Sequence, residues 1–279
     1  MKKIKIKKPS VHIVGNEILR PYNPITVNLI GAGGTGGQVL TALARMNLSL
    51  INLGHPGLMV RLFDDDKVET ANLGRQLFTT AELGQFKAVA LINRINRFFG
   101  SNWKAETMRY DQHMADRNAA ASATLTISCV DKVEARFSIA KILIETVHNY
   151  HGRNRPKYWM DFGNSRTSGQ VILSTLDKIT QPLSKQYETV DSLPLVTEEY
   201  RDLLLSSEEA DDTPSCSLAE ALTKQDLFIN STLANYGASL LWQLFREGIL
   251  FNRGCFLNLK DFISKPLKIE QHGNNRPRR

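Results

Sequence analysis

The sequence has few cysteines, and they are not spaced as metal ligands. Cys129, Cys216 and Cys255 are the three cysteines in 279 residues, and no two of them form a C-x-x-C pair. Structural zinc sites and disulfide frameworks depend on closely spaced or paired cysteines. The six histidines are also scattered along the chain and suggest no ligand set. We therefore expect no zinc and no disulfide framework.

Long apolar stretches are also missing. No hydrophobic run approaches the roughly 18 residues that a membrane-spanning helix needs. The basic start MKKIKIKKPS is followed by strand-like residues instead of the apolar core of a signal peptide. We expect a cytoplasmic protein without a membrane partner. The net charge of +7 suits an anionic ligand or an acidic partner. Nucleic acid is not an expected partner, because zinc-finger spacing and RNP-like aromatic motifs are absent.

A hydrophobic content of 42% is enough for a sizeable core. Strand-like and helical segments alternate, which predicts an α/β fold with a Rossmann-like, doubly wound, mostly parallel sheet and helices on both faces. C-terminal helices and a hairpin are appended. The sequence predicts strands at 25–30, 58–64, 103–110, 123–131, 157–164 and 168–176, helices at 84–100, 132–150, 195–205 and 217–250, and a hairpin at 254–269.

A glycine-rich turn joins the first of these strands to a helix. In the stretch GAGGTGG, Gly31, Gly33, Gly34 and Gly36 include the spacing G-x-G-x-x-G. Such glycines let the backbone approach a phosphate, and the N-terminus of the following helix favours its negative charge. A dinucleotide is the usual ligand of this motif taken alone. The alternative is a turn that needs glycine for tight packing and binds nothing.

The second strand ends in an acid, Asp64, which could bind the ribose of either NAD or ATP. The polar side chains that follow favour ATP. Three phosphates need amide, guanidinium and ammonium donors, which a dehydrogenase does not require at this place. The chain supplies these donors at Asn72, Arg75, Gln76 and Lys87.

Asp131 ends the strand predicted at 123–131, at the sheet edge where ligands bind. Its carboxylate could hold Mg²⁺ beside the phosphates. The alternative is that Asp131 caps a helix and that Arg75 and Lys87 are ordinary surface charges.

The motifs GAGGTGG, DDDKVETANLGRQ, GQFK and SCVD occur in this order. Together they resemble the motifs of the ThiF/MoeB/ubiquitin-activating superfamily, over roughly Ile25 to Leu250. The second motif is similar to the family pattern D-x-D-x-V-x-x-x-N-L-x-R-Q at every fixed position, namely Asp64, Asp66, Val68, Asn72, Leu73, Arg75 and Gln76. The chain further resembles a plasmid-encoded bacterial branch, the PRTRC-system ThiF-like proteins.

The resemblance implies a ubiquitin-like modifier-activating enzyme of the adenylyltransferase type. Such an enzyme binds ATP and Mg²⁺, joins the C-terminal carboxylate of a small ubiquitin-like protein to AMP, and releases pyrophosphate. Carried over by position, Asp64 would bind the ribose. The phosphates would be contacted by Asn72, Arg75 and Lys87, with Gln76 in support.

The remaining roles also come from the resemblance. Asp131 would organise Mg²⁺, and Asp66 would stabilise the turn that presents Asn72 and Arg75. Relatives commonly form homodimers, and the amphipathic region Asp226–Leu244 has apolar surface for either the core or a dimer.

Cys216 follows an acidic stretch, residues 188–212, which holds nine acids and one base. Relatives have in this place a loop that crosses the substrate's tail, often with a cysteine that accepts the acyl group. The resemblance thus implies a catalytic Cys216 and a clamp on the tail; a passive thiol and a solvated linker are the alternatives.

Two features of many relatives are missing. One is the set of zinc-binding C-x-x-C pairs, and the other is an arginine-bearing N-terminal helix, for which Arg20 is the nearest candidate. Lys132 stands where relatives commonly have asparagine.

These features suggest an organisation along the chain. Residues 1–24 are a basic, β-like lead-in, 25–187 an ATP-binding adenylation domain, and 188–217 an acidic crossover loop. Residues 218–265 are C-terminal helices and a hairpin that complete the same domain, and 266–279 are a basic tail.

Two other functions stay open. A NAD-dependent oxidoreductase is favoured by the glycine turn alone, and in it Arg75, Lys87 and Asp131 would be dispensable for cofactor binding. A non-catalytic nucleotide-binding scaffold would show no pyrophosphate exchange with any carrier.

Overall fold

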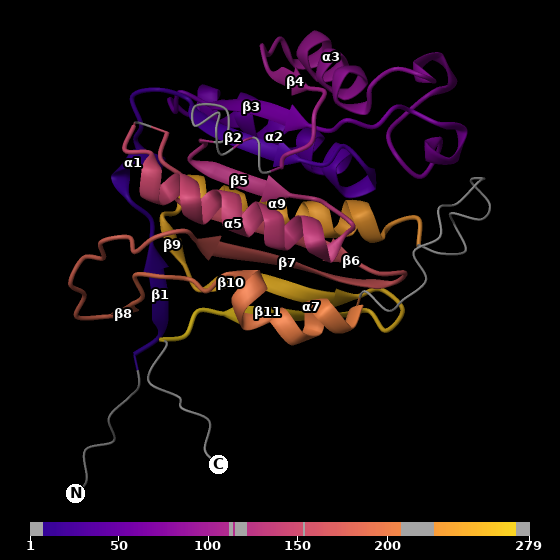
Figure 1. The fold of residues 1–279 in the computed structure, drawn as a ribbon. Helices are drawn as coiled ribbons and strands as arrows, with labels where there is room; N and C mark the ends of the chain where they lie inside the picture. The colour runs from indigo at the N-terminus through magenta and orange to yellow at the C-terminus, as the bar shows by residue number, and fades with distance from the viewer. Residues whose placement is uncertain (1–7, 112–113, 115–121, 153, 208–225, 272–279) are drawn as a thin grey trace, which may run out of the picture.

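The computed structural model describes residues 8–111, 114, 122–152, 154–207 and 226–271 (Figure 1). In chain order the elements are β1 (Ser10–Ile13), α1 (Asn16–Leu19), β2 (Ile25–Ile30), α2 (Gly34–Asn52), β3 (Leu58–Phe63), η1 (Thr70–Asn72), η2 (Thr80–Glu82), α3 (Lys87–Phe99), β4 (Lys104–Glu106), β5 (Leu125–Ser128), α5 (Val133–Asn149), β6 (Tyr158–Asn164), β7 (Ser168–Thr175), β8 (Glu188–Thr189), α6 (Val196–Glu199), α7 (Arg201–Ser207), α9 (Ile229–Arg246), β9 (Ile249–Leu250), β10 (Asn252–Asn258) and β11 (Ile263–Lys268). The two η elements are short 3-10 helices.

One sheet of eight strands has the order β11-β10-β7-β6-β5-β2-β3-β4 (Figure 1). Neighbours from β6 through β5, β2 and β3 to β4 are parallel, and β7, β10 and β11 continue the sheet in antiparallel fashion. From β2 the chain first fills one side of the sheet with β3 and β4, and then crosses to the other side with β5. The predicted fold class is therefore confirmed, and the predicted hairpin is β10–β11.

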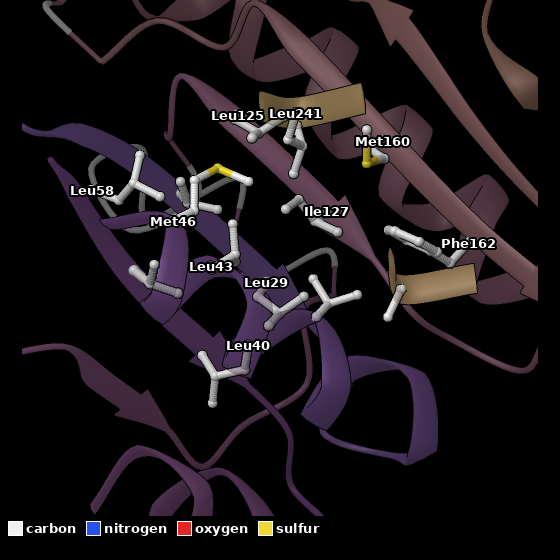
Figure 2. Packing of buried hydrophobic residues seen from close by; sticks show 14 of the residues in the cluster. Leu29, Leu40, Leu43, Met46, Leu58, Leu125, Ile127, Met160, Phe162 and Leu241 are labelled. Carbon is white, nitrogen blue, oxygen red and sulfur yellow. The ribbon is translucent and has the colours of Figure 1, made fainter. Parts of the chain in front are cut away.

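Side chains alternate between the two faces of the sheet, because successive residues of a strand point to opposite sides. Leu29 of β2 and Met160 of β6 belong to one apolar cluster, the first cluster. Ile30 of β2 and Trp159 of β6 belong to another, the second cluster, on the opposite face. Figure 2 shows part of the first cluster, where side chains of α2 such as Leu43 lie close to those of β2 and β5. The central strands of the sheet are thus buried on both faces, as in other doubly wound folds.

Helices cover both faces. Side chains of α2, α3 and α9 belong to the first cluster, and those of α5 belong to the second. α9 overlaps the predicted amphipathic region Asp226–Leu244, and it buries Leu240 and Leu241 in the core. A Cβ on Gly237 of this helix would collide with the ring of Phe162 on β6. α9 therefore packs closely on the sheet. Within the described residues, no helix combines the length and the hydrophobicity needed to cross a bilayer.

Much of the acidic stretch packs against the rest of the molecule. β8 pairs with β1, which also pairs with β9, in a separate three-stranded sheet. The described part of the stretch ends at residue 207, and within it Val190, Leu193 and Val196 are buried. A merely solvated linker, one alternative for this stretch, therefore does not describe residues 188–197, because these apolar side chains anchor them, whereas most of α7 is exposed.

Several predicted elements differ from the structure; residues 249–250, within the helix predicted at 217–250, form β9, and the strand predicted at 123–131 is the shorter β5. The helix predicted at 195–205 is divided into α6 and α7 at Tyr200. Glu199 pairs with the buried Arg253 of β10, and Tyr200 packs edge-on against Phe256 of the same strand. These long-range contacts interrupt the helix. The strand predicted at 103–110 is the shorter β4, whose three residues pair with β3.

The carboxyl ends of the parallel strands meet at one edge of the sheet. The register aligns Ile30 of β2 with Phe63 of β3 and with Ser128 of β5, and Ser128 with Asp161 of β6. The crevice between β2 and β5 is the topological switch point, where sheets of this kind bind ligands. The residues directly after β2, β3 and β5 at this edge are Gly31, Asp64 and Cys129.

Candidate functional site

The glycine turn between β2 and α2 is tightly folded. Gly31 has a φ of +96°, which favours glycine, and a Cβ on Gly36 would collide with the carbonyl oxygen of Gly31. A Cβ on Gly34 would lie 2.5 Å from Nδ2 of Asn230. A Cβ on Gly33, the residue before α2, would have no heavy atom within 4 Å. Gly33 therefore borders open space at the N-terminus of a long helix, as phosphate binding requires.

Asp64 is anchored to this turn. The N–H of Ala32 donates to Oδ2 of Asp64 at 2.6 Å, and the N–H of Asp66 donates to Oδ1 at 3.0 Å. Burial raises the pKa of the Asp64 carboxyl, against the hydrogen bond from Ala32 and the charge of Lys87. Each oxygen keeps acceptor capacity for a hydroxyl group. The structure thus places the predicted ribose-binding acid beside the predicted phosphate-binding turn.

Lys87 is the buried first residue of α3. Its Nζ lies 2.8 Å from Oδ2 of Asp66, and its N–H donates to the Asp66 carbonyl oxygen at 2.9 Å. Asp66 therefore holds the start of α3, rather than contacting the turn at Asn72 and Arg75 that the sequence suggested. The Asp66 side chain is 61% exposed, so this ion pair contributes at most about 1 kcal/mol. A phosphate could replace Asp66 as the partner of Lys87 at little cost.

Asn72, Arg75 and Gln76 lie on the segment from η1 onward. Asn72 is buried, and its Oδ1 accepts the N–H of Glu69 at 2.8 Å in a capping box. Burial lowers the pKa of the Arg75 guanidinium. Gln76 is 8% exposed, and its Oε1 is buried without a hydrogen-bond partner among the described residues. Because an unmade hydrogen bond on a buried acceptor is unfavourable, a donor on a ligand would stabilise this position.

The same segment is fixed beside the first turns of α2. Arg94 of α3 donates to the carbonyl oxygen of Leu77 at 2.6 Å and pairs with Glu82 at 2.5 Å. A Cβ on Gly37 of α2 would lie 3.9 Å from Cβ of Leu77. Arg75 and Gln76 are thus carried on a segment that contacts the helix following the glycine turn.

Asp131 lies between β5 and α5 and is exposed. Its Oδ1 accepts the N–H of Lys132 at 2.9 Å, whereas the capping position of α5 is occupied by Lys132. Asp131 lines a cavity of about 710 Å³. The N–H of Cys129 donates to the carbonyl oxygen of Ile30 at 2.8 Å, so the end of β5 lies against the glycine turn. One wall of the cavity is apolar and comes from Val196, Tyr200, Leu203, Leu204, Phe256 and Leu257.

Sequence reasoning missed a buried ion pair beneath this edge. Nε of Arg136 on α5 lies 3.1 Å from Oδ2 of Asp161 on β6, with side chains 5% and 1% exposed. Ser128 donates to Oδ1 of Asp161 at 2.6 Å and accepts the indole N–H of Trp159 at 2.8 Å. Burial raises the pKa of Asp161, against the charge of Arg136. The one signal in the sequence is an acid within the otherwise apolar strand YWMDF.

A second missed contact joins three chain segments at the same edge. Oδ1 of Asn230, in the first turn of α9, accepts the hydroxyl of Thr35 at 2.8 Å and the amide of Asn164 at 3.2 Å. Thr35 is in the first turn of α2, and Asn164 ends β6. This contact fixes the N-termini of α2 and α9 side by side.

Cys129 and Cys255, the cysteines in the described part of the chain, are both free thiols. Cys216 lies outside the described residues. Burial raises the pKa of the Cys129 thiol, and burial also raises the pKa of Cys255 to about 11. Both are therefore poor nucleophiles near neutral pH.

The residues present suit ATP and Mg²⁺. Gly33 leaves space for a phosphate at a helix N-terminus. Mg²⁺ usually takes one or two carboxylates together with phosphate oxygens and water, so the exposed carboxylate of Asp131 is an adequate protein ligand. Among the described residues, no group of three or more His, Cys, Asp or Glu side chains could hold a metal without a nucleotide.

Comparison with known proteins agrees with this geometry. The chain matches the model of the ThiF family over residues 9–244. Ubiquitin-like modifier-activating enzyme 5 of Xenopus laevis is 31% identical over 162 residues, which is 53% of this chain and 36% of that protein. The enzyme of the same name from Gallus gallus is 31% identical over 173 residues, 56% of this chain and 39% of that protein. The match thus spans little more than a third of these curated relatives.

Two solved structures share the fold. PaaA has a TM-score of 0.57 at 15% sequence identity, covering 88% of this chain and 73% of that one. E. coli MccB, in a structure with MccA, has a TM-score of 0.54 at 13% identity, covering 93% of this chain and 67% of that one. Because the family model covers most of the residues, this chain belongs to the ThiF family.

Proposed function

We propose that the chain binds ATP at the glycine turn and adenylates the C-terminal carboxylate of a partner held in the adjoining cavity. The observation that carries this proposal is the position of Asp131. It lines the cavity of about 710 Å³ and follows the strand end that contacts the glycine turn. A nucleotide on the turn and a chain end in the cavity would meet there. Membership of the ThiF family supports the proposal.

The reaction requires no nucleophile from the enzyme. A carboxylate oxygen of the partner attacks the α-phosphorus of ATP, the bond from that phosphorus to the oxygen bridging to the β-phosphate breaks, and pyrophosphate leaves. Two anions must approach, so fixed positive charges stabilise the transition state. Arg75 and Lys87 would supply these charges, Asn72 and Gln76 would contact the nucleotide through their amides, and Asp64 would bind the ribose.

Mg²⁺ would be held by Asp131 together with the phosphates. When bound, the ion neutralises charge on the transferred group and on the leaving pyrophosphate. Lys132 follows Asp131 directly, and its ammonium adds a further positive charge at this edge.

The partner in this proposal is a small ubiquitin-like protein, because the curated relatives are named for activating ubiquitin-like modifiers. Its extended tail would run over β7 and β10 beneath α6 and α7, where the cavity has its apolar wall. We place the enzyme in the cytoplasm, as a homodimer of the PRTRC-system branch.

Cys216 is proposed as the acyl acceptor in a second step, in which its sulfur attacks the acyl carbon and AMP leaves. The other two thiols support this assignment, because burial raises the pKa of both Cys129 and Cys255.

Ligand-dependent thermal unfolding tests the nucleotide assignment. A ligand that binds the folded state raises the melting temperature. We expect a rise with Mg²⁺ and ATP but not with NAD, and a smaller rise for Asp131→Ala. A rise with NAD alone, equal in the variant, would replace the proposal with an oxidoreductase. ATP binding without pyrophosphate exchange, even with the cognate carrier, would indicate a scaffold.

A further inference from the structure

Arg136 holds three backbone carbonyl groups around the candidate site. Its Nη2 donates to the carbonyl oxygens of Val130 at 2.6 Å and Phe162 at 3.0 Å, and its Nη1 donates to that of Asp131 at 3.3 Å. Val130 and Asp131 belong to the connection from β5 to α5, and Phe162 is on β6. One guanidinium group therefore joins the end of one strand to the connection that carries Asp131.

Buried surroundings restrict this guanidinium to one place. Nε of Arg136 pairs with Asp161, which Ser128 also holds. A Cβ on Gly163 would lie 2.2 Å from Nε2 of Gln170 and 3.1 Å from Nη2 of Arg136, so the guanidinium is closely surrounded on this side as well. Nε, Nη1 and Nη2 all have partners, and the planar fork of arginine suits several fixed acceptors at once.

Stability alone does not account for this arrangement. A buried ion pair is often no more stable than apolar residues of similar volume, and apolar residues would suit the interior between α5 and the sheet. Apolar residues could not bind the carbonyl groups of Val130 and Asp131, whereas the guanidinium fixes both. The carboxylate of Asp131 is in turn fixed by its hydrogen bond from Lys132.

We infer that Arg136 is a positioning residue, which sets the carboxylate of Asp131 for Mg²⁺–ATP by holding the backbone of residues 130–131. This inference rests on the proposed function, because it assumes that Asp131 is the metal ligand. Arg136 acts through the backbone and does not touch the ion. Residues that orient a metal ligand typically change metal affinity about 10- to 100-fold when they are replaced.

The test is calorimetric ATP binding, measured in EDTA and over a series of Mg²⁺ concentrations, for the wild type, Arg136→Lys and Asp131→Ala. Lysine keeps the positive charge, but its single nitrogen lacks the planar fork with which Arg136 reaches Asp161 and the three carbonyl groups at once. We expect Arg136→Lys to raise the Mg²⁺ concentration for half-maximal ATP affinity about 10- to 100-fold and to leave the affinity in EDTA unchanged. A wild-type Mg²⁺ requirement in a folded Arg136→Lys protein would overturn the inference.

Arg155→Lys is the matched control. Arg155 also pairs with an aspartate, Asp177 at 2.8 Å, and donates to a backbone carbonyl, that of Val147 at 3.2 Å. It follows α5, whereas Arg136 is near the start of that helix. We expect the Mg²⁺ requirement of Arg155→Lys to equal that of the wild type. If Arg155→Lys and Arg136→Lys raise this requirement equally, the effect comes from the loss of any arginine contact, and the inference is overturned.

Asp161→Asn keeps the inference testable if Arg136→Lys does not fold. This change removes the charge partner of Arg136 and leaves the three carbonyl groups in place. We expect a lower melting temperature with an unchanged Mg²⁺ requirement. A large increase in that requirement would show that the ion pair sets the site, and would contradict positioning through the carbonyl groups. If Asp131→Ala has the same Mg²⁺ requirement as the wild type, Asp131 is not the metal ligand. That result would contradict the proposed function instead.

Discussion

The backbone N–H of Ala32 donates a 2.6 Å hydrogen bond to the carboxylate of Asp64. This contact joins the residue after β3 to the glycine turn after β2, so the two predicted parts of a nucleotide site are positioned together. Hydrogen bonds to a carboxylate are short and strong. The site is therefore organised by the protein's own contacts.

Replacing Asp64 should weaken ATP binding more than replacing its neighbour. A hydrogen bond to a charged group contributes about 1.5–3 kcal/mol, so we expect Asp64→Ala to raise the Kd for ATP roughly ten- to a hundredfold, as measured by calorimetry. Asp65→Ala is the control, because Asp65 is exposed and pairs with the exposed Arg109. Equal losses in both variants would rule out a specific contact of Asp64 with the ribose.

The glycine turn offers a pair of substitutions with opposite expectations. Gly33→Ala should fold, at a cost of about 1 kcal/mol for alanine at a helix N-cap, but should lose ATP affinity because the methyl group occupies the open space at α2. Gly36→Ala should fail to fold normally, because its methyl group collides with the Gly31 carbonyl oxygen. Circular dichroism and ATP titration of both variants check this. Normal ATP affinity in Gly33→Ala would contradict phosphate binding at this turn.

Local patterns were sufficient to predict most of the sheet. The alternation of strands and helices indicated the doubly wound order, and GAGGTGG indicated the turn at Gly31 and Gly36. The pairing of Arg136 with Asp161 could not be predicted, because the two residues belong to different elements, α5 and β6, and periodicity carries no information about such contacts. The break at Tyr200 has the same origin, since its cause is a contact with Phe256 of β10.

The pairing of Lys87 with Asp66 was also beyond sequence reasoning, and it leads to a prediction. Lys87→Met should reduce the rate of pyrophosphate exchange about 10²- to 10³-fold, which is typical for the loss of one group that stabilises transition-state charge. Asp66→Asn should retain exchange and change the free energy of unfolding by no more than about 1 kcal/mol, because this ion pair is largely exposed. Loss of exchange in Asp66→Asn would assign Asp66 a direct role.

The proposed transfer of the acyl group to Cys216 gives a prediction that does not depend on the fold. Cys216→Ala should leave pyrophosphate exchange intact and abolish a thiol-sensitive adduct with the carrier, visible on non-reducing gels. Cys129 and Cys255 should not substitute for Cys216, because burial raises the pKa of both thiols. An adduct that persists unchanged in the variant would exclude Cys216 as the attachment point.

The free energy of unfolding should fall in mild acid because of His12, which lies against Tyr158 at the start of β6. His12 of β1 is fully buried, with Nδ1 2.8 Å from the carbonyl oxygen of Val190 and Nε2 2.9 Å from the hydroxyl of Tyr158. A carbonyl oxygen can only accept, so Nδ1 carries a proton. Burial lowers the pKa of His12 from its usual value, against the contact with Val190, and so favours the neutral ring, in which Nε2 accepts from the tyrosine hydroxyl.

The sign of the pH dependence follows from this lowered pKa. In the unfolded chain His12 titrates near pH 6.5, so below that pH the unfolded chain binds a proton that the folded protein does not. The free energy of unfolding should then fall as pH decreases, by up to about 1.4 kcal/mol per pH unit for one such group, until the lower folded pKa is passed. His55 acts in the same direction, because burial also lowers its pKa.

Urea unfolding at pH 7.5, 6.5 and 5.5 measures the slope of the free energy of unfolding against pH. His12→Gln should reduce it; a wild-type slope in His12→Gln would show that this ring is not the titrating group.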